Sequence, residues 1–131
     1  MPKGDGDWTA LIKLLEELWA TKSPQKAYST LFELLVKYDS NYMECQWDII
    51  HGMEFFGGYE AELVDSLLTK PAGLTLTMLS RLINGGQKQI GATRIDLLLD
   101  QVINRADVDE GLIRFAQECK ARLKSHQNNY S

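Results

Sequence analysis

Apolar residues recur along the chain at the three- and four-residue intervals of an α-helix, and short breakers divide this pattern into seven segments. The breakers are rich in proline, glycine and asparagine, which start or stop helices: Ser23-Pro24, Gly57-Gly58, Pro71-Ala72-Gly73 and Asn84-Gly85-Gly86. We expect helices over about 7–21, 23–38, 40–57, 58–70, 75–83, 92–104 and 107–125. No stretch alternates for long enough to predict a strand.

The pattern therefore predicts an all-α fold of about seven helices. Short links between successive helices favour antiparallel neighbours. Two arrangements fit this expectation, namely an irregular bundle or a HEAT-like superhelix of stacked α-α pairs. The 131 residues suit one domain, 1–131, large enough to bury a core without disulfides or metals. Residues 1–6 and 127–131 are expected to be flexible ends.

The core should be built from the apolar stripe of each helix. In the segment 40–57 this stripe is expected to contain Met43, Trp47, Ile50 and Met53. Both cysteines, Cys45 and Cys119, lie on apolar helical faces, which favours buried, reduced thiols and a cytoplasmic protein. The polar N-terminus does not resemble a signal peptide, and no run of 18 apolar residues predicts a membrane span.

Acidic residues are concentrated in the first half of the chain. Residues 1–70 contain twelve acids and six bases, whereas residues 71–131 contain six acids and eight bases. No Lys or Arg occurs from Tyr38 to Thr69, a segment that contains seven acids. Such a segment repels phosphates and attracts basic partners, which argues against nucleic-acid binding.

The acids and aromatic residues of this segment are the candidate partner-binding residues. Acids with nearby aromatic side chains are typical of interface anchors, although a merely solvated helix face would look similar. The candidates are Asp39, Tyr42, Glu44, Asp48, Tyr59, Glu60, Glu62 and Asp65.

A catalytic constellation is not evident. His51 and Glu54 lie on adjacent turns of one helix and are the strongest metal-ligand pair, but matching ligands on other helices are scarce. No nucleophile elbow or phosphate-binding glycine loop is present. We therefore expect no metal, no cofactor and no enzymatic activity. Glu54 points toward the expected core, where a carboxylate needs a partner; Arg81 suits that role, with His51 and Asn84 as further members of a structural polar network.

Two segments resemble a family of small all-helical bacterial immunity proteins: Trp47-Asp48-Ile49-Ile50-His51-Gly52-Met53-Glu54-Phe55-Phe56, and Pro71 followed by Leu79-Ser80-Arg81-Leu82-Ile83-Asn84. These proteins belong to contact-dependent growth inhibition and polymorphic toxin systems. The resemblance covers about 41–84. It implies an inhibitor that neutralises a cognate toxin domain, often a nuclease, inside the producing cell, with Trp47, His51, Glu54, Arg81 and Asn84 holding the fold.

Three functions remain open at this point. The first is an immunity protein whose acidic helical surface binds a basic, nuclease-like toxin domain. The second is a helical-repeat scaffold or regulator that binds a peptide or helix of another partner. The third is a small enzyme with a site at His51 and Glu54.

Overall fold

A computed structural model describes residues 9–38 and 46–129 of the chain. The helices are α1 (Thr9–Trp19), α2 (Tyr28–Lys37), α3 (Gln46–Phe56), α4 (Glu60–Thr69), α5 (Gly73–Asn84), α6 (Ile95–Ile103) and α7 (Glu110–Asn129). A 3₁₀ turn, η1 (Pro24–Ala27), precedes α2, and two short strands, β1 (Gln89–Ile90) and β2 (Thr93–Arg94), lie between α5 and α6. The predicted all-α fold is confirmed.

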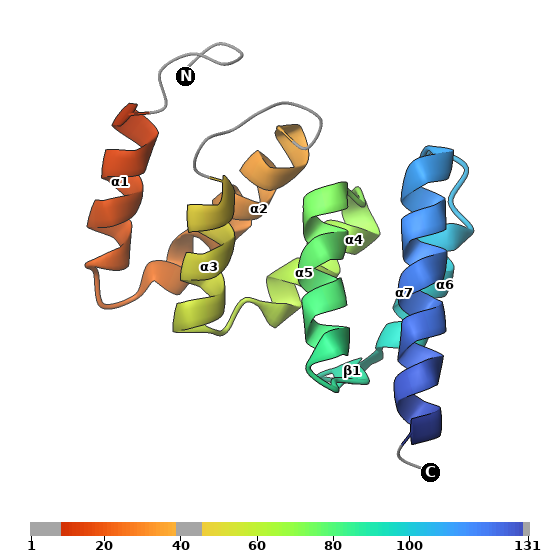
Figure 1. Cartoon of the computed structure of the whole chain (residues 1–131). Helices are drawn as coiled ribbons and strands as arrows, with labels where there is room; N and C mark the ends of the chain where they lie inside the picture. The colour runs from red at the N-terminus through yellow and green to blue at the C-terminus, as the bar shows by residue number, and fades with distance from the viewer. Residues whose placement is uncertain (1–8, 39–45, 130–131) are drawn as a thin grey trace.

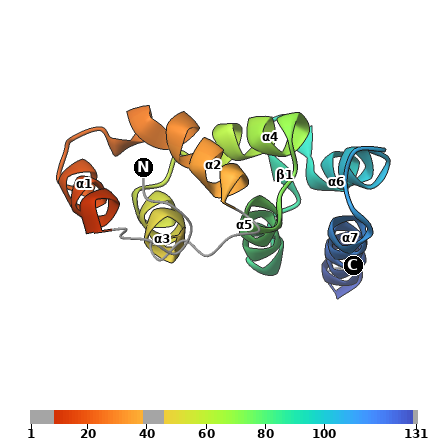
Figure 2. The same ribbon diagram turned by 90° about the horizontal axis from the view of Figure 1, so that it is seen from above.

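The helices form two layers. Figure 2 shows α1, α3, α5 and α7 side by side in one layer and α2, α4 and α6 in the other. In Figure 1 the helices of the first layer run downward and those of the second run upward, so successive helices are antiparallel. This is the stacked arrangement of helix pairs, one of the two arrangements expected beside an irregular bundle.

The core lies between the two layers. Its fully buried side chains come from every helix from α2 to α7, and Leu15 of α1 extends it to the N-terminal end. Cys119 of α7 is buried and is a free thiol, as expected; Cys45 lies outside the described residues.

Trp47 corrects the expected core. Its side chain is 42% exposed, whereas the expected Ile50 and Met53 are buried together with Ile49. The expected Met43 lies outside the described residues. Trp47 lies more than a quarter turn around the helix from the mean direction of the three buried residues, because successive residues are separated by about 100°. The expected stripe was therefore rotated relative to the face that α3 presents to the second layer.

The segment before α6 also differs from the expectation of a helix starting at about Ala92. Strands β1 and β2 form an antiparallel hairpin in which Ile90 pairs with Thr93. Gly91 takes the first loop position with a φ of +57°, where two-residue hairpin turns require glycine. Ile90 is buried against the core, so the hairpin is anchored by one apolar side chain.

Helix α7 begins at Glu110, three residues after the start expected at about 107. The carboxylate of Asp109 accepts a hydrogen bond from the backbone N–H of Leu112 at 2.8 Å, so Asp109 caps the helix. Asp107 instead pairs with Arg105, whose guanidinium also donates to the carbonyl oxygens of Leu68 and Thr69. Arg105 thereby satisfies carbonyls at the end of α4 from the link between α6 and α7.

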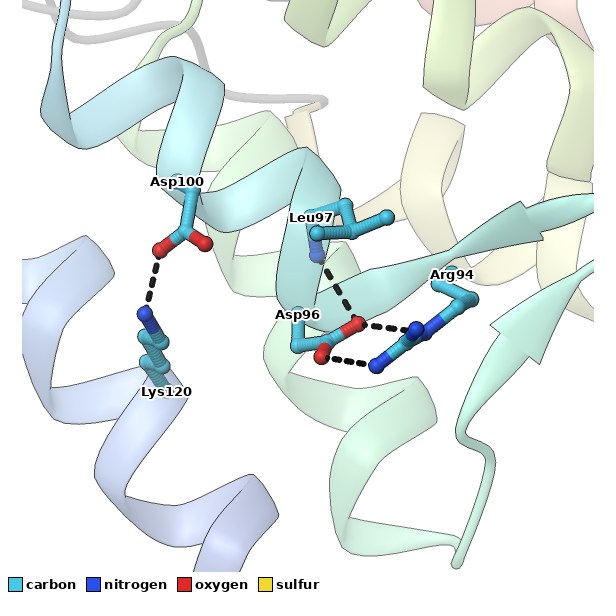
Figure 3. A network of polar contacts seen from close by, with 5 residues as sticks. All are labelled: Arg94, Asp96, Leu97, Asp100 and Lys120. Carbon is cyan, nitrogen blue, oxygen red and sulfur yellow. Dashed lines mark hydrogen bonds and ion pairs between the residues drawn. The ribbon is translucent and has the colours of Figure 1, made fainter.

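Polar contacts join α6 to its neighbours (Figure 3). The Lys120 ammonium of α7 pairs with the Asp100 carboxylate of α6. At the start of α6, Arg94 pairs with Asp96, which also accepts a hydrogen bond from the N–H of Leu97. Helix α7 was expected to end at about 125, but it continues to Asn129, so residues 127–129 of the expected flexible end are helical. Residues 1–6 lie outside the described part.

Candidate protein-binding surface

A groove between α2 and α4 collects acidic side chains. It has a volume of about 460 Å³ and is lined by Ser29, Phe32, Glu33, Val36, Lys37, Glu62, Asp65, Ser66, Thr69 and Lys70. Phe32 is 3% exposed and Val36 is half-buried, so the floor is apolar. Glu33, Glu62 and Asp65 supply carboxylates, and none of them has an ion-pair partner in the part of the chain that the structure describes.

The two walls of the groove use the same helical positions. On each wall the lining residues are spaced i, i+3, i+4, i+7 and i+8, and every α4 position lies 33 residues after its α2 counterpart, from Ser29 and Glu62 to Lys37 and Lys70. Because α2 and α4 run in the same sense (Figure 1), Glu62 lies at one end of the groove, Glu33 and Asp65 lie near its middle, and the two lysines lie at the other end. Glu33 was missed by the sequence analysis; this repeated spacing is the signal that could have found it.

A second groove lies between α4 and the β1–β2 hairpin. It has a volume of about 540 Å³, and Glu60, Asp65 and Ile90 are among its lining residues. Asp65 therefore stands on the ridge between the two grooves. The Oε1 atom of Glu60 is buried and has no hydrogen-bond partner among the described residues. Four acids, Glu33, Glu60, Glu62 and Asp65, thus line this side of the second layer; we call them the α4 acidic surface.

Tyr59 does not belong to this surface. It was a candidate interface anchor, but its side chain is only 6% exposed and forms part of the core. Burial raises the pKa of Tyr59 to about 12, and the carboxylates of Glu54 and Glu60 add to the rise. Tyr59 follows the left-handed glycines Gly57 and Gly58, which redirect the chain and turn the ring inward.

Asp48 is exposed, but it lies on α3 in the other layer and lines neither groove of the α4 acidic surface. Asp39, Tyr42 and Glu44, the remaining candidates, lie outside the described residues. The structure therefore brings together Glu60, Glu62 and Asp65 and adds Glu33, while Asp48 stands apart from them.

The exposed side of α3 is aromatic. Trp47 and Phe55 are 42% and 81% exposed, and His51 between them is also exposed, with its ring centroid 5.8 Å from that of Trp47. The three residues are spaced i, i+4 and i+8 along one side of the helix. His51 was expected in a polar network with Glu54; it contacts Trp47 instead, because residue 51 points toward solvent when Ile50 and Met53 face the core.

The expected pair of Glu54 and Arg81 is confirmed. Arg81 donates two hydrogen bonds to the Glu54 carboxylate, from Nε at 2.7 Å and from Nη2 at 2.9 Å, and this contact joins α3 to α5. The hydrogen bonds and charge of Glu54 raise the pKa of the Arg81 guanidinium. The Arg81 side chain is 48% exposed, so the pair lies at the rim of the core.

Asn84 makes a different contact from the one expected. Its Oδ1 accepts a hydrogen bond at 3.5 Å from Nη1 of Arg122, which also donates to the Ser80 hydroxyl. Asn84 therefore joins α5 to α7, whereas the Glu54–Arg81 pair joins α5 to α3.

Among residues 9–38 and 46–129, no group of three His, Cys, Asp or Glu side chains is placed to hold a metal ion. In the same residues no helix combines the length and apolar character needed to cross a membrane. Comparison with protein-family models, curated proteins and solved structures gives no match for this chain.

Proposed function

We propose that this protein is an immunity protein that binds and neutralises a basic toxin domain through the α4 acidic surface. The observation that carries the proposal is the placement of Glu33, Glu62 and Asp65 on the walls of one groove, with no ion-pair partner among the described residues. A nuclease domain is a fitting target, because an enzyme that binds phosphates has a basic active-site surface.

The inhibitor needs no chemistry of its own in this proposal. Its carboxylates occupy the cationic surface that a nuclease uses for phosphates, and their field speeds the encounter of the two proteins. The resemblance of residues 47–56 and 79–84 to immunity proteins points in the same direction. The Glu54–Arg81 pair in that region joins two helices and supports the fold. The site of action is the cytoplasm of the producing cell.

The test uses the small C-terminal domain of the protein encoded directly upstream as the binding partner. Co-production of the two chains should rescue growth and yield a one-to-one complex. Reversing two charges with Glu62→Lys and Asp65→Lys should lower the association rate about tenfold or more at low salt and flatten its salt dependence.

The matched control is Glu16→Lys with Glu17→Lys, which changes the net charge equally on exposed positions of α1. It should lower the association rate much less, because screening limits the reach of exposed charges to about 10 Å. Equal effects of the two double variants would reject the α4 acidic surface as the contact region. If the upstream reading frame encoded a metabolic enzyme, the proposal that the partner is a toxin would be rejected.

A scaffold or regulator that binds a helix or peptide of a non-toxin partner is the second candidate. The observation that favours it is the aromatic side of α3, where Trp47 and Phe55 are exposed. Binding through that side would depend little on salt. Loss of binding in Trp47→Ala, with Glu62→Lys and Asp65→Lys without effect, would select this function.

A further inference from the structure

The groove between α2 and α4 has two ends of opposite charge. Glu62 lies in the first turn of α4, Glu33 and Asp65 lie near the middle of α2 and α4, and Lys37 and Lys70 lie at the end where both helices terminate. Phe32 and Val36 form an apolar floor between them. With both signs of charge on its walls, the groove can discriminate a partner segment that carries both signs from one that is only basic.

The lysines are not engaged elsewhere by strong contacts. Neither ammonium forms an ion pair with another described residue, and Lys37 lies 5.4 Å from the centroid of the Tyr38 ring. Lys70 is close enough to Asp107 to lower the pKa of that carboxyl slightly, but Asp107 already pairs with Arg105. Both lysines also line the adjoining hollow toward the start of α7, so the groove is open beyond them.

The dimensions suit a helix. On each wall the lining positions run over nine residues, so that eight rises of 1.5 Å give a length of about 12 Å, or somewhat more than two helical turns. An amphipathic helix can lay its apolar side against Phe32 and Val36 while its flanking charges reach the walls.

We infer that the groove between α2 and α4 binds an amphipathic helix of the partner protein in one orientation, with its cationic half over Glu33, Glu62 and Asp65 and an acidic residue between Lys37 and Lys70. The inference rests on the proposed function for the choice of surface and names the part of the partner that fills it. Orientation follows from charge, because reversing the helix end to end would place like charges together.

The test uses two stapled helical peptides of about eleven residues, since short unstapled helices are marginal in water. Both carry the same leucine stripe and the same Lys and Glu residues. In the segregated peptide all lysines occupy one half and all glutamates the other, whereas in the interspersed peptide they alternate. Fluorescence anisotropy with the full chain should give at least tenfold tighter binding for the segregated peptide.

Reversing the charges of Lys37 and Lys70 tests whether these two lysines orient the bound helix. Lys37→Glu with Lys70→Glu should weaken the segregated peptide at least tenfold, and Lys37→Gln with Lys70→Gln should weaken it less. If the peptide were bound only by general attraction of its lysines to an acidic protein, the reversal would tighten binding, because it adds negative charge to the chain. Both positions are exposed, and circular dichroism checks that the variants remain helical.

Equal binding of the two peptides, or tighter binding after the lysine reversal, would overturn the inference. Its failure is separate from failure of the proposed function. If Glu62→Lys with Asp65→Lys slows toxin association, the proposed immunity function stays supported even when the chain binds the two peptides equally. Discrimination between the peptides keeps the helix groove even when no toxin is found upstream.

Discussion

The indole of Trp19 lies directly against the backbone of Gly52, which joins the end of α1 to the middle of α3. A Cβ atom added to Gly52 would stand 2.2 Å from Cζ2 of Trp19 and 2.5 Å from its Cε2. The indole also stacks on Phe56, with 5.6 Å between the ring centroids, so it is held from two sides. Glycine is required here by this close approach, although alanine is the better helix former.

Gly52→Ala should therefore destabilise the protein. The helix propensity of alanine contributes about 1 kcal/mol in its favour, but displacing a stacked indole costs about 1–3 kcal/mol. We expect a net loss of up to about 2 kcal/mol in the free energy of unfolding, measured by urea denaturation. Trp19→Ala should make the same Gly52→Ala change neutral or favourable, because the clash is gone.

Gly111→Ala in the first turn of α7 is the matched control. A Cβ at Gly111 would meet only the Asp109 carboxylate oxygen, at 3.4 Å. This substitution should leave the stability unchanged or raise it by up to about 1 kcal/mol, because the helix propensity of alanine is not opposed by a clash. A Gly52→Ala protein as stable as the parent chain would show that α1 does not depend on this contact.

The close contact of Trp19 and Gly52 also shows what the sequence could predict. Helical periodicity and the glycine and proline breakers predicted seven helices, because each helix must bury a stripe recurring every 3.6 residues. They could not orient α3, since apolar residues surround that helix: Trp47, Ile49, Ile50, Met53, Phe55 and Phe56. The packing of α1 and of the second layer selects the buried face, and that information is tertiary.

The hairpin before α6 and the full α4 acidic surface were also not predictable from the sequence pattern. Strands of two residues are too short to alternate, so only Gly91 hinted at a turn. The charge distribution identified Glu60, Glu62 and Asp65 but not Glu33, because Glu33 joins them only when α2 and α4 are neighbours. Tyr59 was misplaced for a related reason, since an aromatic residue beside acids is compatible with both surface and core.

The pair of Glu54 and Arg81 should contribute a small, salt-dependent stability. Its geometry is bidentate, but the side chains are 20% and 48% exposed, so solvent screens the charges. A double-mutant cycle with Glu54→Gln and Arg81→Gln should give a coupling free energy of about 0.5–1 kcal/mol. The coupling should fall in high salt. Zero coupling in low salt would mean that the pair does not stabilise the contact of α3 with α5.

Tyr59 should make the protein sensitive to strong alkali. Its folded pKa of about 12 lies above the ordinary value of 10, so the unfolded chain loses the proton first. The stabilising contribution is complete below pH 10 and is lost as the pH rises from about 10 toward 12. The expected loss is on the order of 2 kcal/mol at the upper end.

Urea denaturation at several alkaline pH values measures this loss. Tyr59→Phe removes the ionisable hydroxyl and should flatten much of the pH dependence. Tyr28 retains a share, because burial and the Glu60 carboxylate also raise its pKa. An unchanged pH dependence in Tyr59→Phe would assign the alkaline instability to other groups.

Cys119 should report the opening of α7. Its side chain is fully buried, and burial raises the pKa of the thiol, so a thiol reagent reaches it only when α7 separates from the core. In a Cys45→Ser background, Asp100→Asn breaks the ion pair with Lys120 and should speed modification about two- to fivefold. Leu123→Ala, at a position 2% exposed, should speed it by about tenfold or more.

Arg94→Gln is the control, because Arg94 pairs with Asp96 at the start of α6 and not with a residue of α7 (Figure 3). Equal modification rates in all four proteins would mean that the reagent reaches Cys119 without any opening of α7.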